Sequence, residues 1–161
     1  MGVPGRRRSS VPSPEHRKHV TLRLKHALGV GLILALVGAG CGSGSQLGAK
    51  ALLQQSKLLQ SEAAEGALLA QDAVAGKTTR IYLREHSSEL YEAASQAEAT
   101  LKAAKTQSGL ESKLRQLAVL ASQVSADLKR LGSASEDEDR ALARELQAAA
   151  LASAKIGEGL T

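Results

Sequence analysis

Leucine and alanine recur at helical spacing along the chain from about residue 46 onward. Four stretches place small or apolar residues alternately three and four positions apart, which is the spacing of a single apolar helix face. No proline follows Pro14, so long helices are expected here. The four predicted seams are Leu52, Ser56, Leu59, Ala63, Gly66, Ala70 and Ala73; Leu83, Ser87, Leu90, Ala94, Ala97, Leu101 and Ala104; Leu110, Leu114, Leu117, Ala121, Val124, Leu128 and Leu131; and Leu142, Leu146, Ala149, Ser153, Ile156 and Leu160.

Short polar segments mark the predicted helix ends. Three of them have the Ser-x-x-Glu/Gln spacing of a capping box, in which side chain and backbone satisfy each other's free groups: 43–46, 108–111 and 135–138. Thr78 or Thr79 is expected to cap the second helix, and Gly76 to end the first near residue 75. Two interpretations of residues 107–110 stay open, a tight turn between antiparallel helices or a kink in one long helix.

Four amphipathic helices with short connections predict an all-α, antiparallel up-down four-helix bundle over residues 49–161. The chain contains no Phe or Trp, so its core must be built from Leu with Ala and Ser at many seam positions. Such a core buries little apolar surface per residue, and the helices must approach closely to fill it.

A different pattern precedes the bundle. From His26 to Cys41, an apolar run follows a basic segment and ends in small residues before the single cysteine. This is the layout of a signal peptide, with a charged, an apolar and a small-residue cleavage region. The final residues Val37, Gly38, Ala39, Gly40 and Cys41 resemble the lipobox of a bacterial lipoprotein precursor. The resemblance covers residues 26–41 only.

The resemblance implies a processed, lipid-anchored protein. Residues 1–40 would be a signal peptide with a long basic leader, cleaved before Cys41 after recognition of Val37, Gly38, Ala39 and Gly40. Fatty acyl chains on Cys41, palmitate among them, would hold the protein on the extracytoplasmic face of the cell membrane. The outer membrane is implied if the host has one, because Gly42 rather than Asp follows the cysteine. Residues 41–48 would then be a Gly/Ser spacer.

One alternative for the leader stays open, an uncleaved single-helix anchor. The apolar run is shorter than the roughly 20 residues that a spanning helix requires, and it is rich in glycine. These features favour the cleaved form.

The chain's positive charge lies in its leader. The net charge is +5, but residues 1–40 carry seven Lys/Arg and one Asp/Glu, which leaves residues 41–161 with fourteen and fifteen, a net −1. The later part has only Tyr82 and Tyr91 as aromatic residues, too few for base stacking. No nucleic-acid partner is expected.

Sequence motifs for catalysis or metal binding are weak. Gly76-Lys77-Thr78 lacks the earlier glycine and the preceding strand of a phosphate-binding loop. His86, near Glu85 and Glu89, has no paired copy of a di-iron motif, and it is expected to be an exposed edge residue. The acidic run 136–139 is expected to complement a helix dipole rather than bind calcium. A non-enzymatic protein without cofactor or metal is predicted.

Two functions follow from these observations. The first is a membrane-tethered helical module that interacts with a protein partner or with copies of itself through apolar helix faces. The alternative is a small ligand-binding carrier serving a transporter. A carrier needs convergent polar groups inside the bundle, and the seams offer only Ser56, Ser87 and Ser153, so we favour the first.

Overall fold

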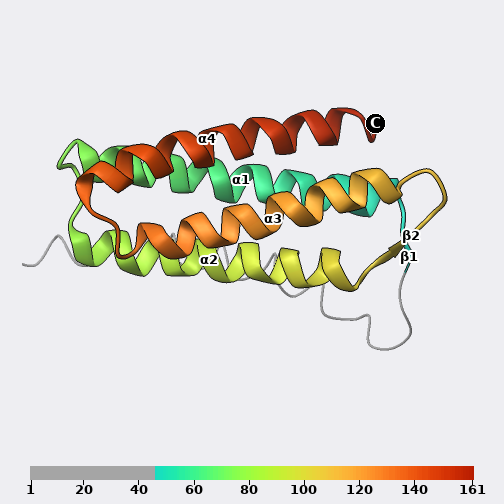
Figure 1. Cartoon of the computed structure of the whole chain (residues 1–161), viewed down its shortest axis with the longest axis horizontal. Coiled ribbons are helices and arrows are strands. Elements are labelled where there is room, and N and C mark those ends of the chain that lie inside the picture. The colour runs from blue at the N-terminus through green and yellow to red at the C-terminus, as the bar shows by residue number, and fades with distance from the viewer. Residues whose placement is uncertain (1–45) are drawn as a thin grey trace, which may run out of the picture. The chain divides into compact units, whose positions relative to one another are not determined.

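The computed structural model describes residues 46–161, in which four helices pack side by side (Figure 1). It confirms the predicted all-α four-helix bundle. The elements in chain order are β1 (Gln46–Leu47), α1 (Ala49–Val74), α2 (Arg80–Ala103), β2 (Lys105–Thr106), α3 (Glu111–Leu131) and α4 (Glu136–Glu158).

Two of the predicted helix starts are confirmed by their caps. The Thr79 side chain accepts a hydrogen bond from the backbone N–H of Tyr82 at the start of α2. Ser135 and Glu138 form the complete capping box of α4. Gly76 follows the end of α1 with φ +66°, a left-handed conformation that glycine adopts without strain. Local sequence signals therefore define these ends.

The other two capping boxes were wrong. Gln46 does not begin a helix, because β1 pairs in parallel with β2 and Thr106 donates a hydrogen bond of 2.7 Å to the Leu47 carbonyl. The cap of α1 is Gly48, without a side-chain bond. At α3 the cap is Leu110, and Glu111 accepts instead from the Gly109 N–H. Pairing between distant segments replaces local capping here.

The same pairing decides how α2 connects to α3. The backbone leaves the helical conformation at Ala104, forms β2 and re-enters a helix at Glu111. The interpretation of one kinked helix is therefore wrong, and the connection is longer than a tight turn. Gly109, at φ +90°, allows the change of direction.

Helices α1 and α4 pack closely because small residues meet between them. A Cβ added to Gly157 would lie 2.7 Å from Ser56 Oγ, and Ser56 donates a 2.6 Å hydrogen bond to the Ser153 carbonyl. A similar approach joins α2 and α3, where a Cβ on Gly132 would lie 3.0 Å from Ser87 Oγ. Ser56 and Ser87 thus belong to close helix contacts, as seam positions in a thin core should.

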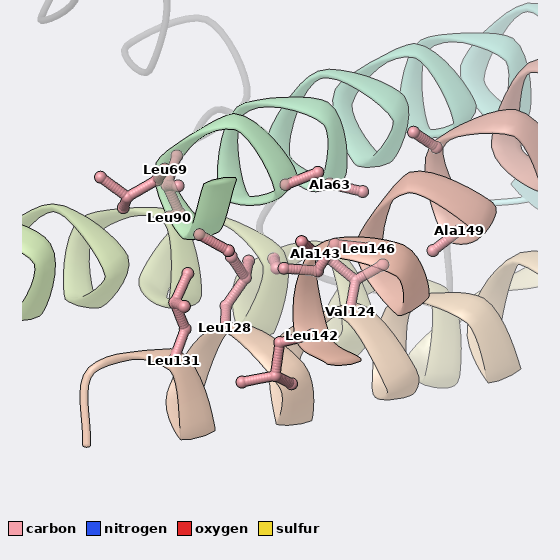
Figure 2. Close-up of a cluster of buried hydrophobic side chains, with 14 of the residues drawn as sticks. Ala63, Leu69, Leu90, Val124, Leu128, Leu131, Leu142, Ala143, Leu146 and Ala149 are labelled. Carbon is pink, nitrogen blue, oxygen red and sulfur yellow. The ribbon is translucent and has the colours of Figure 1, made fainter. Parts of the chain in front are cut away.

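Side chains from all four helices fill the centre of the bundle (Figure 2). The fully buried leucines come from every predicted seam, while alanines fill the positions between them. A second, smaller cluster of Leu52, Leu59, Leu101, Leu117 and two alanines lies at the β1–β2 end. The seam prediction is confirmed apart from its ends: the half-buried members are Ala73, Ala104, Leu110, Leu114, Ile156 and Leu160.

Candidate functional site

The predicted lipid attachment and cleavage residues, Cys41, Val37, Gly38, Ala39 and Gly40, lie outside the described residues. Their roles stay predictions. Within residues 46–161, every helix is too polar or too short to cross a membrane.

His86 connects α1 and α2, contrary to the expectation of an exposed edge residue. Its Nε2 lies 2.7 Å from Glu65 Oε1 on α1, and its Nδ1 lies 3.2 Å from Glu89 Oε2 on α2. The Tyr82 ring stacks on the imidazole with 5.4 Å between centroids. Only 26% of the His86 side chain is exposed. The histidine is therefore held in place by contacts from two helices and is not a free surface group.

The charges around His86 favour its protonated form. Burial lowers the pKa of His86, but the hydrogen bonds to Glu65 and Glu89 outweigh this effect and raise it above its usual value. Beside it on α1, burial raises the pKa of Glu62 to about 7; the Glu65 carboxylate adds to the rise and His86 opposes it. Glu62 therefore changes charge near neutral pH, beside a histidine whose pKa is also raised.

Across residues 46–161, no group of three or more His, Cys, Asp or Glu side chains is arranged to hold a metal ion. His86 and its carboxylate neighbours instead form an ionic contact between two helices.

An open groove follows the boundary between α3 and α4. We call it the α3–α4 groove. Its two overlapping parts have volumes of about 610 and 350 Å³ and share Leu120, Gln123 and Ala152. The remaining lining residues are Arg115, Gln116, Val119, Ser122, Ala126, Asp127, Glu145, Ala148, Ala149 and Ile156.

The floor of the α3–α4 groove is apolar and shallow. Alanines line its α4 side, and Val119 on α3 is 60% exposed. Short side chains cannot reach across from one helix to the other, so solvent has access to the space between them. Contiguous exposed apolar surface rimmed by polar residues is typical of sites that bind another molecule.

The two ends of this groove differ in charge. At one end Arg115 is exposed and makes no ion pair with any residue of 46–161. At the other end Asp127 and Glu145 share one cation, Arg130, at 3.4 and 3.6 Å. Burial raises the pKa of Asp127, the neighbouring Glu145 adds to the rise, and Arg130 opposes it. The groove therefore has a positive end and a negative end.

A second depression of about 550 Å³ lies on the other side of α4, where it meets the end of α1. Leu151, which is 64% exposed, lines it together with Val74, Ala75 and Arg144. Because this depression and the α3–α4 groove share Ala148, apolar surface continues across the outer face of α4.

The seam serines do not form a ligand-binding set. Ser56 donates to the Ser153 carbonyl, and Ser87 donates to the Arg84 carbonyl of its own helix. The Ser56 and Ser87 hydroxyls thus satisfy backbone groups inside the helix packing, whereas the Ser153 hydroxyl is buried without a hydrogen-bond partner among the described residues. The grooves above have the size of ligand pockets but are open to solvent, which suits a protein surface better than a small molecule.

The acidic run 136–139 is only partly the exposed helix start that was expected. Glu136, Asp137 and Glu138 are exposed, but Asp139 is fully buried. Arg80 reaches from the start of α2 to lie 2.7 Å from Asp139 Oδ2, and it also donates to the Ala134 carbonyl. Asp139 therefore links α2 to the α3–α4 connection, a structural role that its sequence neighbours did not reveal.

The Gly76-Lys77-Thr78 segment serves as a helix end. Gly76 follows α1 in a left-handed conformation, and Lys77 pairs with Asp72 at 3.9 Å. The expected structural interpretation of these residues is confirmed.

Comparisons with protein-family models, curated proteins and solved structures give no match.

Proposed function

We propose that this protein is a membrane-tethered lipoprotein whose helical bundle acts as an interaction module outside the cytoplasm. The observation that carries the proposal is the position of the only cysteine. Cys41 follows an apolar run and small residues, and the spacer Gly42-Ser43-Gly44-Ser45 leads from it to the bundle. The sequence thus has an anchor, a spacer and a folded domain in the order that a tethered module requires.

Lipid chemistry supports this order. One acyl chain holds a protein only marginally, since each buried methylene contributes about 0.8 kcal/mol, whereas two chains give stable anchoring. A diacylglycerol on the Cys41 thiol would supply two chains and replace the apolar leader as the anchor. The membrane lipid would then be the protein's first partner.

The bundle supports an interaction role better than a catalytic one. The surface depressions are lined mainly by apolar and small side chains, with glutamines, Ser122 and a few charged residues among them. The α3–α4 groove and the outer face of α4 offer apolar surface to another macromolecule. A protein partner or a second copy is the occupant that such open surfaces fit.

The test of the anchor is metabolic labelling of the full chain in bacteria with a fatty acid analogue. Wild-type protein should incorporate the label and remain with the membranes after a high-salt wash. Cys41→Ser should lose the label and retain a larger precursor, because cleavage depends on lipidation. The double variant Cys41→Ser/Ser43→Cys is the matched control: it restores a thiol two residues away, and it should stay unlabelled.

An unchanged result would reject the proposal. If Cys41→Ser keeps the label, the size and the membrane fraction of the wild type, the apolar run is an uncleaved anchor. If the double variant is labelled like the wild type, the modification follows any exposed thiol and the lipobox resemblance has no role.

A further inference from the structure

Three features of the α3–α4 groove bear on what covers it: its length, its apolar middle and its charged ends. Arg115 and Asp127 are twelve positions apart on α3, which corresponds to about 18 Å along the helix. Between them the groove is lined by the exposed Val119, by Gln116 and Gln123, and by alanines of α4. The ion pair between Arg130 on α3 and Glu145 on α4 bridges the two helices only at the negative end of the groove.

We propose that this groove binds the same groove of a second copy of the chain, with the two α3 helices antiparallel about a two-fold axis. Charge complementarity favours this occupant. A two-fold axis exchanges the ends of the groove, so Arg115 of each copy meets Asp127 and Glu145 of the other. Each of the two carboxylates then gains a second cation, and the exposed guanidinium gains its counter-charges.

The register follows from the positions of these residues. Arg115 and Asp127 are equally far from position 121 in sequence, and so are Val119 and Gln123. An axis passing beside position 121 therefore brings both charged pairs together and places each Val119 over Gln123 of the other copy. The alanines of α4 leave room for this contact, since they project little into the groove.

The area of this surface predicts a weak dimer. Two packed helices are about 20 Å wide, so the groove offers roughly 400 Å² per copy, about half of a standard interface. Micromolar affinity is therefore expected in solution. The inference rests on the interaction role proposed above. Tethering would strengthen the dimer by confining both copies to one membrane. Their β1 ends, at one end of each bundle (Figure 1), would lie at opposite ends of the dimer.

The test is sedimentation equilibrium of the full-length chain in mild detergent, with charge-reversed variants. Arg115→Glu should weaken the dimer by about tenfold or more, because it faces two carboxylates of the other copy. Glu145→Arg should do the same against Arg115 of the other copy. An equimolar mixture of the two variants should recover part of the dimerisation, because the glutamate introduced in one variant then faces the arginine introduced in the other, while Asp127 still opposes it at that contact.

Lys57→Glu is the matched control. It makes the same charge change at an exposed position of α1 away from the groove, and it should leave dimerisation unchanged. Far-UV circular dichroism of each variant checks that the bundle remains folded. A wild type that stays monomeric at about 100 μM, well above micromolar affinity, or a mixture that recovers nothing, overturns the inference.

The outcomes separate the inference from the proposed anchor. If the wild type is monomeric but Cys41 is still labelled, the α3–α4 groove binds another protein or none, and the anchor stands. If dimerisation follows the charge pattern but labelling fails, the self-association stands and the lipoprotein proposal does not.

Discussion

The contact between α1 and α2 and the contact between α3 and α4 differ in the side chains that bridge the two helices. At the first, His86 lies between Glu65 and Glu89 and is covered by Tyr82. At the second, alanines leave the α3–α4 groove open except where Arg130 meets Glu145. The stability of a helix contact that is bridged by titratable groups depends on pH. The stability of an open apolar groove depends on which molecule covers it. The two sides of one bundle thus respond to different conditions.

The close pairs α1–α4 and α2–α3 hold the rest of the domain together. Leu117→Asp places a charge in this shared core and should lower the free energy of unfolding more than any other substitution proposed for this domain. Leu117 is fully buried, so the substitution leaves an unpaired charge among leucines and should cost about 5 kcal/mol or more. That is comparable with the whole stability of a small domain.

Circular dichroism and urea titration measure this effect. Gln123→Asp, at an exposed position of the same helix in the α3–α4 groove, is the control. At protein concentrations too low for the proposed dimer it should stay within about 0.5 kcal/mol of the wild type. Equal losses from the two substitutions would contradict the assignment of Leu117 to the core.

Gly66→Val should have the next largest effect. A Cβ at Gly66 would lie 2.5 Å from Leu128 Cδ2 and 3.2 Å from Leu146 Cδ1, where α1, α3 and α4 meet. Overpacking there should lower the free energy of unfolding by about 1–3 kcal/mol. Ser61→Val, at an exposed position of α1, controls for helix propensity and should change stability by less than about 0.5 kcal/mol. A Gly66→Val protein as stable as its control would show that the helices lie farther apart.

The smallest expected effect is the change of folding stability with pH that arises from the titratable groups between α1 and α2. The folded-state pKa values of His86 and Glu62 are both raised. Their protonated forms stabilise the fold at acid pH. The contribution of Glu62 is lost as pH rises to about 7, and that of His86 is lost as pH rises through its raised pKa. After allowance for solvent screening the loss between pH 5 and 8 should be on the order of 1 kcal/mol.

Urea titrations at several pH values measure this dependence. The double variant Glu62→Gln/His86→Gln should remove most of it, while Glu85→Gln, an exposed neighbour, should preserve it. Stability that rises from pH 5 to 8 would contradict the sign of both shifts. In the acid range the opposite slope is expected, because hydrogen bonds to Lys102 and Ser125 lower the pKa of Glu98.

The sequence predicted features that depend on neighbours along the chain. The leucine seams, the Thr79 cap and the Ser135 capping box all follow from spacings of three or four residues, which a helix brings together by itself. These features were sufficient for the four-helix fold.

Features that depend on which helices become neighbours could not be predicted. The β1–β2 pairing joins residues 46–47 to 105–106, and nothing in either segment alone indicates a strand. The burial of Asp139 requires Arg80 from another hairpin, and the contacts of His86 require Glu65 from α1. The α3–α4 groove likewise exists because alanines of α4 lie beside α3, which periodicity on one helix does not specify.

The most direct test of the account is photo-crosslinking from the groove in intact membranes. A benzoylphenylalanine at position 119 of the full-length chain replaces an exposed valine and, in the proposed dimer, faces Gln123 of the other copy. Mass spectrometry should find crosslinks to the α3 peptide around Gln123 of a second chain, and the same group at position 57 should give no such product. Crosslinks from position 119 to a different protein, or none to this chain, would contradict self-association through the α3–α4 groove.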